Sequence, residues 1–417
     1  MDLVDFAQYA RLTDDEPGIG GTIKNRPDDF LVDELPLYPP EGEGDHLYLV
    51  VEKRQRLTTD VVRLLAKHFK VPPTAVGYAG LKDKHAITRQ AFTVEHADPD
   101  AAGAFEDARI RILGVDRQQR KLKRGHHAGN RFSIVIRDVD PTAVLRAKRA
   151  LDRLEQEGVP NYFGEQRFGY RRNNHRLGRL LLLEQWRDFL DEMLGRPIED
   201  ESPAARQARQ AYEEGDYKLA LATWPTVHRF ERQAVGPLSR GAPAHDAVHG
   251  IDAAQRSLLL SAFQSALFNQ VVDRRLRDGT FATIQPGDVP FEHDSRRIFA
   301  VDEDPDALAD AQRRYDAREV SPTGPMWGAK MKRAKHDVDA LDLAVLEEAG
   351  VDPEDLARGE YQPDGLRRSL RMLIADPDCA SGVDEHGPYV KVRFELGRGC
   401  FATTVLREIM KTDAPTP

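Results

Sequence analysis

The sequence contains little cysteine and no long apolar run, and each absence excludes a class of protein. Only two cysteines, Cys379 and Cys400, occur in 417 residues, which argues against a disulfide framework and for a reducing cytoplasm. No apolar run approaches the roughly 20 residues of a membrane-spanning helix, and the first residues lack the pattern of a secretory signal. We therefore expect a cytoplasmic protein without membrane contact.

Motifs for metals and common cofactors are also scarce. No Cys-x-x-Cys pair is present, and neither a Walker nor a Rossmann glycine pattern occurs. We expect no metal and no cofactor. Internal repeats and low-complexity tracts are absent, so the 417 residues are expected to fold as two or three ordinary domains.

The chain lacks an overall positive charge, because 60 Lys and Arg residues face 69 Asp and Glu residues, a net charge of −9. Positive charge is instead concentrated at 82–89, at 109–137, where Asp116 is the only acid, and at 167–179. Such asymmetry is typical of phosphate binding, although a single cluster of this kind is often only a solvated face. These three clusters flank one candidate catalytic residue, Asp83, and together they favour binding of a nucleic acid.

Hydrophobic spacing predicts mixed α and β structure before residue 160 and mostly helices after it. A helix is expected at 58–69, with Thr58 or Thr59 as its N-cap. Loop signals predict irregular structure at 236–250 and 321–325. The expected strands are 46–53, 90–94, 110–115, 132–139 and 390–396, and the other expected helices are 141–158, 176–231, 258–271 and 401–410.

The most informative segment is Gly80-Leu81-Lys82-Asp83-Lys84-His85. Two neighbouring cations should hold the pKa of Asp83 below its ordinary value, and they would repel a metal ion. No other acid lies between Asp60 and Glu95. A single ionised carboxylate on a basic loop favours a nucleophile or a base that acts on a polyanion.

Six stretches together resemble the TruD family of pseudouridine synthases. The most specific is Asn-Tyr-Phe-Gly-Glu-Gln-Arg-Phe-Gly at 161–169. The segment near 181–250 has no clear counterpart in the short bacterial members of the family. It looks like the longer archaeal and eukaryotic form, so the resemblance assigns it no function. The matching stretches, in the family order, are 23–30, 80–88, 129–132, 160–169, 261–269 and 401–408.

The resemblance implies an α+β fold. The catalytic domain of the family is a mixed, mainly antiparallel sheet with flanking helices and a circularly permuted strand order. Residues 1–160 would form its N-terminal part, 161–371 an inserted family-specific α/β domain, and 372–417 its C-terminal part. The change of composition near residue 160 agrees with the first boundary.

The resemblance also implies an activity. The family converts a specific uridine of tRNA, usually at position 13, to pseudouridine, an isomerisation that needs no cofactor. Asp83 would be the catalytic aspartate, either attacking C1′ of the ribose or removing a proton from C2′. The alternatives are an RNA chaperone or other non-catalytic RNA-binding protein, and a metal-dependent nuclease, which would need several converging acids.

The target uridine must leave the RNA stack before it can react, and two further matches concern this flipped nucleotide. Phe132 occupies the family position whose aromatic ring stacks on the extruded base, although a Phe that begins a strand is also typical of a core. Asn130 occupies a position that hydrogen-bonds near the catalytic loop, or it is a turn residue. Phe30 is expected to pack the pocket or the core.

Several cations complete the expected site. Lys24 and Arg407 are alternatives for the partner of Asp83. Lys82 and Lys84 either contact phosphate or tune Asp83, and Arg167 either contacts RNA or shapes a domain junction. tRNA is the expected partner, and the oligomeric state is open.

Overall fold

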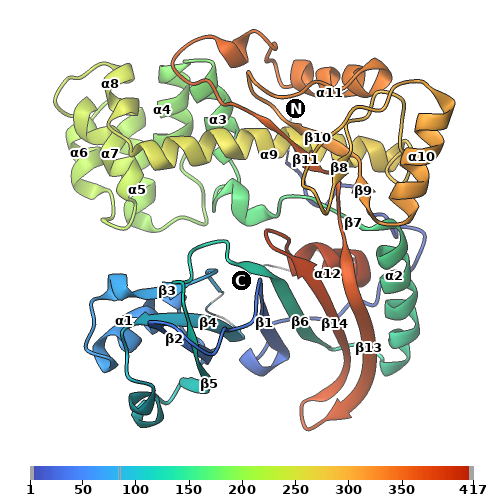
Figure 1. Ribbon diagram of the computed structural model, residues 1–417. Coiled ribbons are helices and arrows are strands. Elements are labelled where there is room, and N and C mark those ends of the chain that lie inside the picture. The colour runs from blue at the N-terminus through green and yellow to red at the C-terminus, as the bar shows by residue number, and fades with distance from the viewer. Residues whose placement is uncertain (1–3, 83, 85, 413–417) are drawn as a thin grey trace. The chain divides into compact units, whose positions relative to one another are not determined.

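A computed structural model describes residues 4–82, 84 and 86–412 (Figure 1). The chain forms two compact units, each assembled from segments that are distant in sequence. The sheet unit comprises Arg11–Pro160 and Arg371–Pro417, and the helical unit comprises Met1–Ala10 and Asn161–Leu370. None of the described helices has both the length and the apolar character that crossing a bilayer requires.

The sheet unit is built on one 8-stranded sheet in which β13-β14-β6-β1-β4-β2-β5 lie in that order and β3 pairs with β4. β1 and β4 are parallel, and the other described pairs of this sheet are antiparallel. The prediction of a mixed, mainly antiparallel sheet is therefore confirmed. The strands are β1 (Phe30–Pro36), β2 (His46–Arg54), β3 (Val76–Tyr78), β4 (Ile87–Glu95), β5 (Ile110–Gln118), β6 (His127–Arg137), β13 (Ile374–Asp384) and β14 (Gly387–Gly397).

Both ends of the sequence contribute to this sheet, because β14 pairs with β6 (Figure 1). In β14, Val390, Val392 and Phe394 are buried at alternate positions, as the sequence pattern predicted. The unit also contains the two-stranded pair β7 (Val159–Pro160) and β12 (Arg371–Met372). Its helices are α1 (Thr58–His68), α2 (Val144–Glu157) and α12 (Ala402–Met410).

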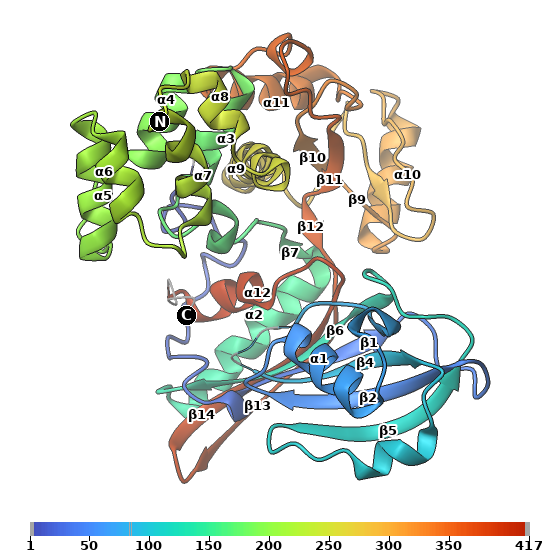
Figure 2. The ribbon, with the colours of Figure 1, turned by 90° about the vertical axis from the view of Figure 1, so that its left-hand side faces the viewer.

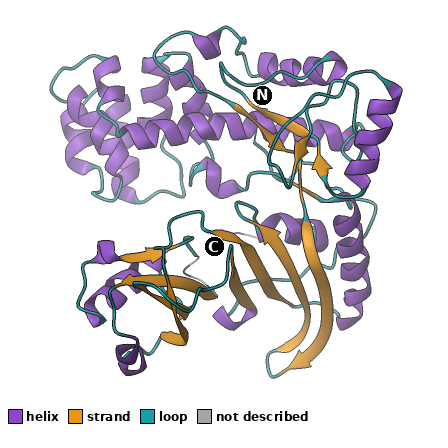
Figure 3. Cartoon of the chain, in the orientation of Figure 1, coloured by secondary structure: helices purple, strands orange, loops and turns teal. Residues whose placement is uncertain are grey.

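The helical unit is arranged around the long helix α9 (Ala253–Arg277), which Figure 2 shows nearly end-on. Helix α3 (Asn174–Leu182) lies close to it because Gly178 has no side chain; a Cβ there would overlap the Leu259 carbonyl oxygen. Helices predominate in this unit (Figure 3). The other helices are α4 (Trp186–Leu194), α5 (Pro203–Glu213), α6 (Tyr217–Thr223), α7 (Arg229–Leu238), α8 (Ala244–His249), α10 (Pro305–Asp316) and α11 (His336–Glu348).

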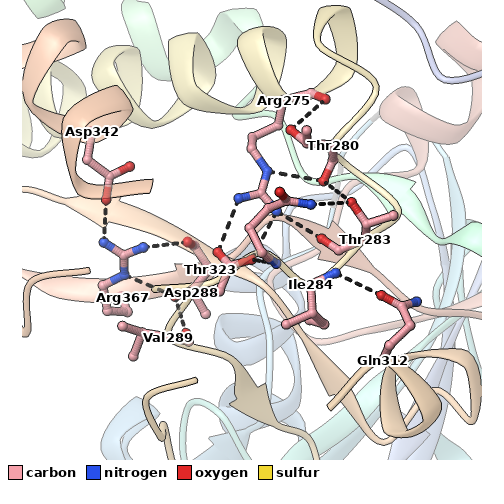
Figure 4. Close-up of polar contacts among 11 residues, drawn as sticks. Arg275, Thr280, Thr283, Ile284, Asp288, Val289, Gln312, Thr323, Asp342 and Arg367 are labelled. Atoms are coloured by element: carbon pink, nitrogen blue, oxygen red, sulfur yellow. Dashed lines mark hydrogen bonds and ion pairs between the residues drawn. The ribbon is translucent and has the colours of Figure 1, made fainter. Parts of the chain in front are cut away.

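Buried polar contacts in the helical unit join α11 to the short strands β10 (Thr323–Met326) and β11 (Leu366–Ser369), and others join α9 to Asp288 (Figure 4). Arg367 donates to Asp342 Oδ2 (2.6 Å) and to Thr323 Oγ1 (3.0 Å). Arg275 donates to both oxygens of Asp288 at 3.1 Å. Burial raises the pKa of Asp342 to about 6.

Two predicted loops of the helical unit are wrong. The segment 236–250 contains the end of α7, with Pro237 in its last turn, and all of α8. The segment 321–325 falls in β9 (Val320–Ser321) and β10, where residues 321–325 are buried. β9 pairs with β8 (Phe291–Glu292) and β10 with β11, so pairing with distant segments overrides the local Pro and Gly signals.

Candidate active site

The predicted catalytic loop lies between β3 and β4 of the sheet unit. Asp83 and His85 are outside the described residues, so the site is defined here by the groups that hold the rest of the loop. The Lys82 amide donates to Thr58 Oγ1 (3.0 Å), and Gln90 Nε2 donates to the Gly80 carbonyl oxygen (3.1 Å).

Thr58 and Gln90 are themselves joined, because the Thr58 hydroxyl donates to Gln90 Oε1 (3.0 Å). The predicted capping role of Thr58 or Thr59 is wrong: Leu57 is the N-cap residue of α1 and makes no side-chain cap bond. The Thr58 hydroxyl instead donates to Gln90 and accepts from the amide of Lys82 in the loop. A buried polar side chain needs such partners, and here they fix the backbone next to Asp83.

Lys82 forms a buried ion pair with Glu34 of β1. Its Nζ lies 2.6 Å from Glu34 Oε2, and the two side chains are 6% and 2% exposed. The ammonium group is therefore already compensated and withdrawn from solvent. Lys84, in contrast, is exposed.

Lys53, at the end of β2, is a second buried lysine, and it was not among the predicted site residues. The residue is 0% exposed, and its Nζ donates to the carbonyl oxygens of Arg56 (2.7 Å) and Lys82 (3.4 Å). Lysine is almost never buried to this extent without partners. In the sequence it is one charged residue at the end of a strand, so no local signal separates it from a solvated lysine.

The sheet brings Glu34, Asn130 and Phe132 to one face. Asn130 of β6 is directly opposite Glu34 of β1, and Phe132 is two residues further along β6. Side chains at i and i+2 of a strand point to the same side, so this face also carries the Glu34 carboxylate that binds Lys82. The loop and the two family-matched positions of β6 are thereby brought together.

Phe132 is 7% exposed and lies in an aromatic cluster. Its ring centroid is 5.5 Å from that of Phe394 and 6.4 Å from that of Phe30, the latter in an edge-on arrangement. Lys24 completes the cluster with its Nζ 5.1 Å from the centre of the Phe30 ring. Three predicted site residues therefore share one cluster.

Asn130 has an unusual environment for a strand residue. Its Oδ1 is buried, and within the described part of the chain no group donates a hydrogen bond to it. A buried amide oxygen without a donor is costly, so such an atom marks a place where a further donor is expected.

His127 of β6 lies near the same loop. Burial and then the charge of Lys82 hold the pKa of His127 below its ordinary value. The imidazole is therefore neutral at pH 7. Nothing in the sequence distinguishes this histidine, because it adjoins His126 in a basic turn.

The remaining predicted site residues lie elsewhere. Arg407 is half-buried in the last turn of α12, in the sheet unit. Arg167 belongs to the helical unit, where its Nε donates to Ser265 Oγ (3.2 Å) and its guanidinium lies 5.6 Å from the centre of the Phe163 ring. Burial lowers the pKa of Arg167.

The cationic clusters are only partly exposed. Arg137 is buried and donates to Asp29 (2.6 Å) and Asp384 (2.7 Å), so it stabilises the fold. In the helical unit Arg171 donates to the Gly195 carbonyl oxygen (3.2 Å). The exposed cations of the 109–137 cluster are Arg109, Arg111, Arg120, Lys123, Arg124 and Arg131.

Comparison with known proteins gives a consistent result. The family model for tRNA pseudouridine synthase D (TruD) matches residues 7–409. The tRNA pseudouridine synthase D of Syntrophotalea carbinolica is 41% identical over 96% of this chain and 99% of that protein. That of Geobacter sulfurreducens is 40% identical over 96% of each chain.

A solved structure is also similar. The chain matches a protein from Methanosarcina mazei, described as tRNA pseudouridine synthase D (TruD), with a TM-score of 0.87 and 26% identity over 97% of this chain and 96% of that one. The predicted similarity to a longer archaeal and eukaryotic form is not supported. The curated relatives named above are bacterial, and their matches extend over nearly the full length of both chains.

Proposed function

The chain belongs to the TruD family of tRNA pseudouridine synthases, and from this premise we propose that Asp83 carries out the isomerisation of a uridine at position 13 of tRNA. The enzyme is an isomerase: the bond between N1 of uracil and C1′ is broken, and C1′ is joined to C5. C5 loses its proton and N1 takes up one, so the atoms balance and no oxidant or reductant is consumed. The supporting observation is the family match across residues 7–409, which includes the loop of Asp83.

The arrangement of the described residues supports specific roles. A stacked uridine is out of reach, so it must leave the helix at a cost of a few kcal/mol. We assign base stacking to Phe132 and a hydrogen bond to the flipped nucleotide or the loop to Asn130, whose buried Oδ1 has no donor within the described residues. Phe30 supports the ring of Phe132 from its edge.

The roles proposed for the lysines of the site follow from whether each side chain is buried or exposed. Lys82 is paired with Glu34 and Lys53 holds the Lys82 carbonyl oxygen, so both position the loop. Lys84 is exposed and is assigned to phosphate. Lys24 is favoured over Arg407 as the partner of Asp83, because Lys24 already contacts the Phe30 and Phe132 cluster. Arg167 is assigned a structural role rather than contact with RNA, because its guanidinium donates to Ser265 of α9.

The sheet unit is proposed as the catalytic domain and the helical unit as the inserted family-specific domain. A cytoplasmic location is also proposed, supported by the two free cysteines. Asp83 acts either as a nucleophile at C1′ or as a base at C2′, and both routes use the same residues.

Site-specific mapping of pseudouridine tests the proposed function. A tRNA transcript with uridine at position 13 is incubated with the protein, treated with carbodiimide and read by primer extension. A stop one nucleotide 3′ of position 13 is expected, and a transcript with cytidine at position 13 is the matched control. Absence of any stop in the uridine transcript, or a stop only at other uridines, would contradict the proposal.

A further inference from the structure

Helix α8 of the helical unit presents two histidines one turn apart. His245 and His249 are stacked, with ring centroids 4.1 Å apart and ring planes inclined by 28°. Both Nε2 atoms face Glu360: the distance is 3.2 Å from His245 to Oε1 and 2.7 Å from His249 to Oε2. The three ligand-type atoms lie within 4.8 Å of one another.

The other ring nitrogens fix the orientation of both imidazoles. His249 Nδ1 lies 2.9 Å from the His245 carbonyl oxygen, which can only accept, so Nδ1 must carry the proton. His245 Nδ1 lies 3.0 Å from Asp246 Oδ1 in the same relation. Histidines that bind metals are oriented in this way, by a carboxylate or carbonyl oxygen at the second nitrogen.

This assignment of protons places the Nε2 atoms, as hydrogen-bond acceptors, opposite the carboxylate oxygens of Glu360, which are also acceptors. With both Nδ1 atoms protonated, each neutral Nε2 directs a lone pair at a Glu360 oxygen, and each contact is attractive only if an added proton or a metal ion lies between the two atoms. Two additional protons would create stacked imidazolium rings with centroids 4.1 Å apart, which repel each other. One divalent ion satisfies all three ligands without that repulsion.

Glu360 is held in place by its backbone. Its amide donates to Glu184 Oε1 (2.6 Å), and the preceding Gly359 has φ +75°, a conformation that favours glycine. Aromatic rings border the ligands: the Trp186 centroid is 5.6 Å from His245 and 5.7 Å from His249. The Tyr361 hydroxyl lies 3.4 Å from His249 Nε2.

We propose that His245, His249 and Glu360 form a Zn²⁺ site that ties α8 to the segment before β11. Two imidazole nitrogens and one carboxylate are a common set of zinc ligands, with water in the fourth position. In a tetrahedral shell with Zn–N near 2.0 Å, ligand atoms are roughly 3.3 Å apart. The 3.2 Å separation of His245 and Glu360 matches this value, whereas the 2.7 Å separation of His249 and Glu360 must widen by roughly 0.6 Å when the ion binds. Mg²⁺ and Ca²⁺ prefer oxygen ligands and are not expected to bind.

The expectation of no metal site overlooked the His-x-x-x-His spacing of residues 245–249. That segment was predicted as a loop, in which a spacing of four has no fixed geometry. In α8 the same spacing places both rings on one face of the helix. The third ligand is 111 residues from His249, so no local pattern includes it.

Calorimetric titration of ZnCl₂ into the full chain, stripped with EDTA and dialysed, tests the proposal. Wild type is expected to bind one Zn²⁺ per chain. His249→Ala should weaken binding by about 100-fold or more, and Asp246→Asn, which alters only the orientation of His245, by about 10-fold. His336→Ala removes an exposed histidine outside the cluster, 3.4 Å from Glu303, and should bind Zn²⁺ like wild type.

Thermal unfolding separates a missing ligand from a disrupted fold. ZnCl₂ should raise the Tm of wild type and His336→Ala but not that of His249→Ala or Glu360→Gln, all compared with EDTA. Far-UV circular dichroism without metal should be the same for all four proteins. Equal Zn²⁺ affinity of wild type and His249→Ala, or no saturable binding by wild type, would overturn the proposal.

Discussion

The two lysines beside Asp83 have opposite environments, although they are indistinguishable in the sequence. Lys82 is withdrawn into an ion pair with Glu34, whereas Lys84 is exposed. Which lysine is buried depends on Glu34, which lies 48 residues away in sequence, across the parallel pair β1–β4. The sequence identified the loop by its chemistry but could not assign separate roles to its cations.

Breaking the buried pair should destabilise the protein strongly. Glu34→Gln leaves the Lys82 ammonium buried without a compensating charge, at an expected cost of about 3–5 kcal/mol in the free energy of unfolding. The double variant Glu34→Gln/Lys82→Met should lose much less than the sum of the single variants. Urea unfolding measures all four corners of this cycle, and additive losses would show that the two groups are not coupled.

The ring of Phe132 should matter more for activity than for stability. Phe132→Leu keeps most of the packing, so the free energy of unfolding should fall by only about 1 kcal/mol. Loss of a stacking platform worth about 1–3 kcal/mol should lower kcat/KM by about 5- to 150-fold.

Phe394→Leu is the matched control for Phe132, because its ring belongs to the same cluster, 5.5 Å from that of Phe132. Its stability should fall by a similar amount, with little loss of kcat/KM. Equal activity of the two variants would identify Phe132 as a core residue only.

At the scale of elements, patterns that depend on neighbouring residues were predicted and pairings across the chain were not. Helix α2 ends at Gly158, with φ +88°, as its sequence indicated. β13, the partner of β14, was missed, because its buried residues are few and do not alternate clearly. α8 was missed for a related reason: six residues between Pro243 and Gly250 are too short for a helical period to be recognised.

The buried network between α11 and β11 predicts a pH dependence. Because the pKa of Asp342 is raised to about 6, the folded chain retains this proton to a higher pH than the unfolded chain. The resulting stabilisation is present below about pH 4 and is lost as the pH rises through about 6, a change of up to roughly 3 kcal/mol.

Comparison with Asp342→Asn isolates this contribution. The difference in free energy of unfolding, wild type minus variant, should decrease between about pH 4 and pH 7 in urea titrations. The groups that face Asp342 are Arg367, Asp288 and Arg275. A constant difference, or one that increases with pH, would show that the carboxyl group is not protonated in the folded chain at about pH 5.

For the whole molecule, the net charge of −9 is a poor guide to its partner. The family resemblance predicted that the C-terminal strand and helix join the N-terminal third of the chain, which no periodicity in the sequence could show; that the partner of β14 is β6 is known only from the structure. Composition located a change near residue 160 but could not show that residues 371–417 return to the first sheet, because that pairing spans more than 200 residues.

Binding of tRNA should weaken with salt through the exposed cations of the sheet unit. The log–log slope of affinity against salt is expected to be about −0.7 to −0.9 per phosphate neutralised. Arg120→Gln/Lys123→Gln should make that slope shallower by about 1 for each phosphate that the variant no longer neutralises, measured by filter binding. Lys67→Gln/Lys70→Gln, two exposed lysines at the end of α1, is the control. A slope unchanged by either pair would exclude the 109–137 cluster as the binding surface.

Asp83→Asn provides the most direct test of the proposed chemistry. Pseudouridine formation in the tRNA transcript and tRNA affinity are measured for wild type, Asp83→Asn and Asp45→Asn, an exposed acid of the same unit. We expect the Asp83 variant to lose turnover by about 10²–10⁴-fold or more while its affinity for tRNA changes little, and the Asp45 variant to match wild type. Turnover by Asp83→Asn close to that of wild type would contradict the assignment of Asp83 as the catalytic residue.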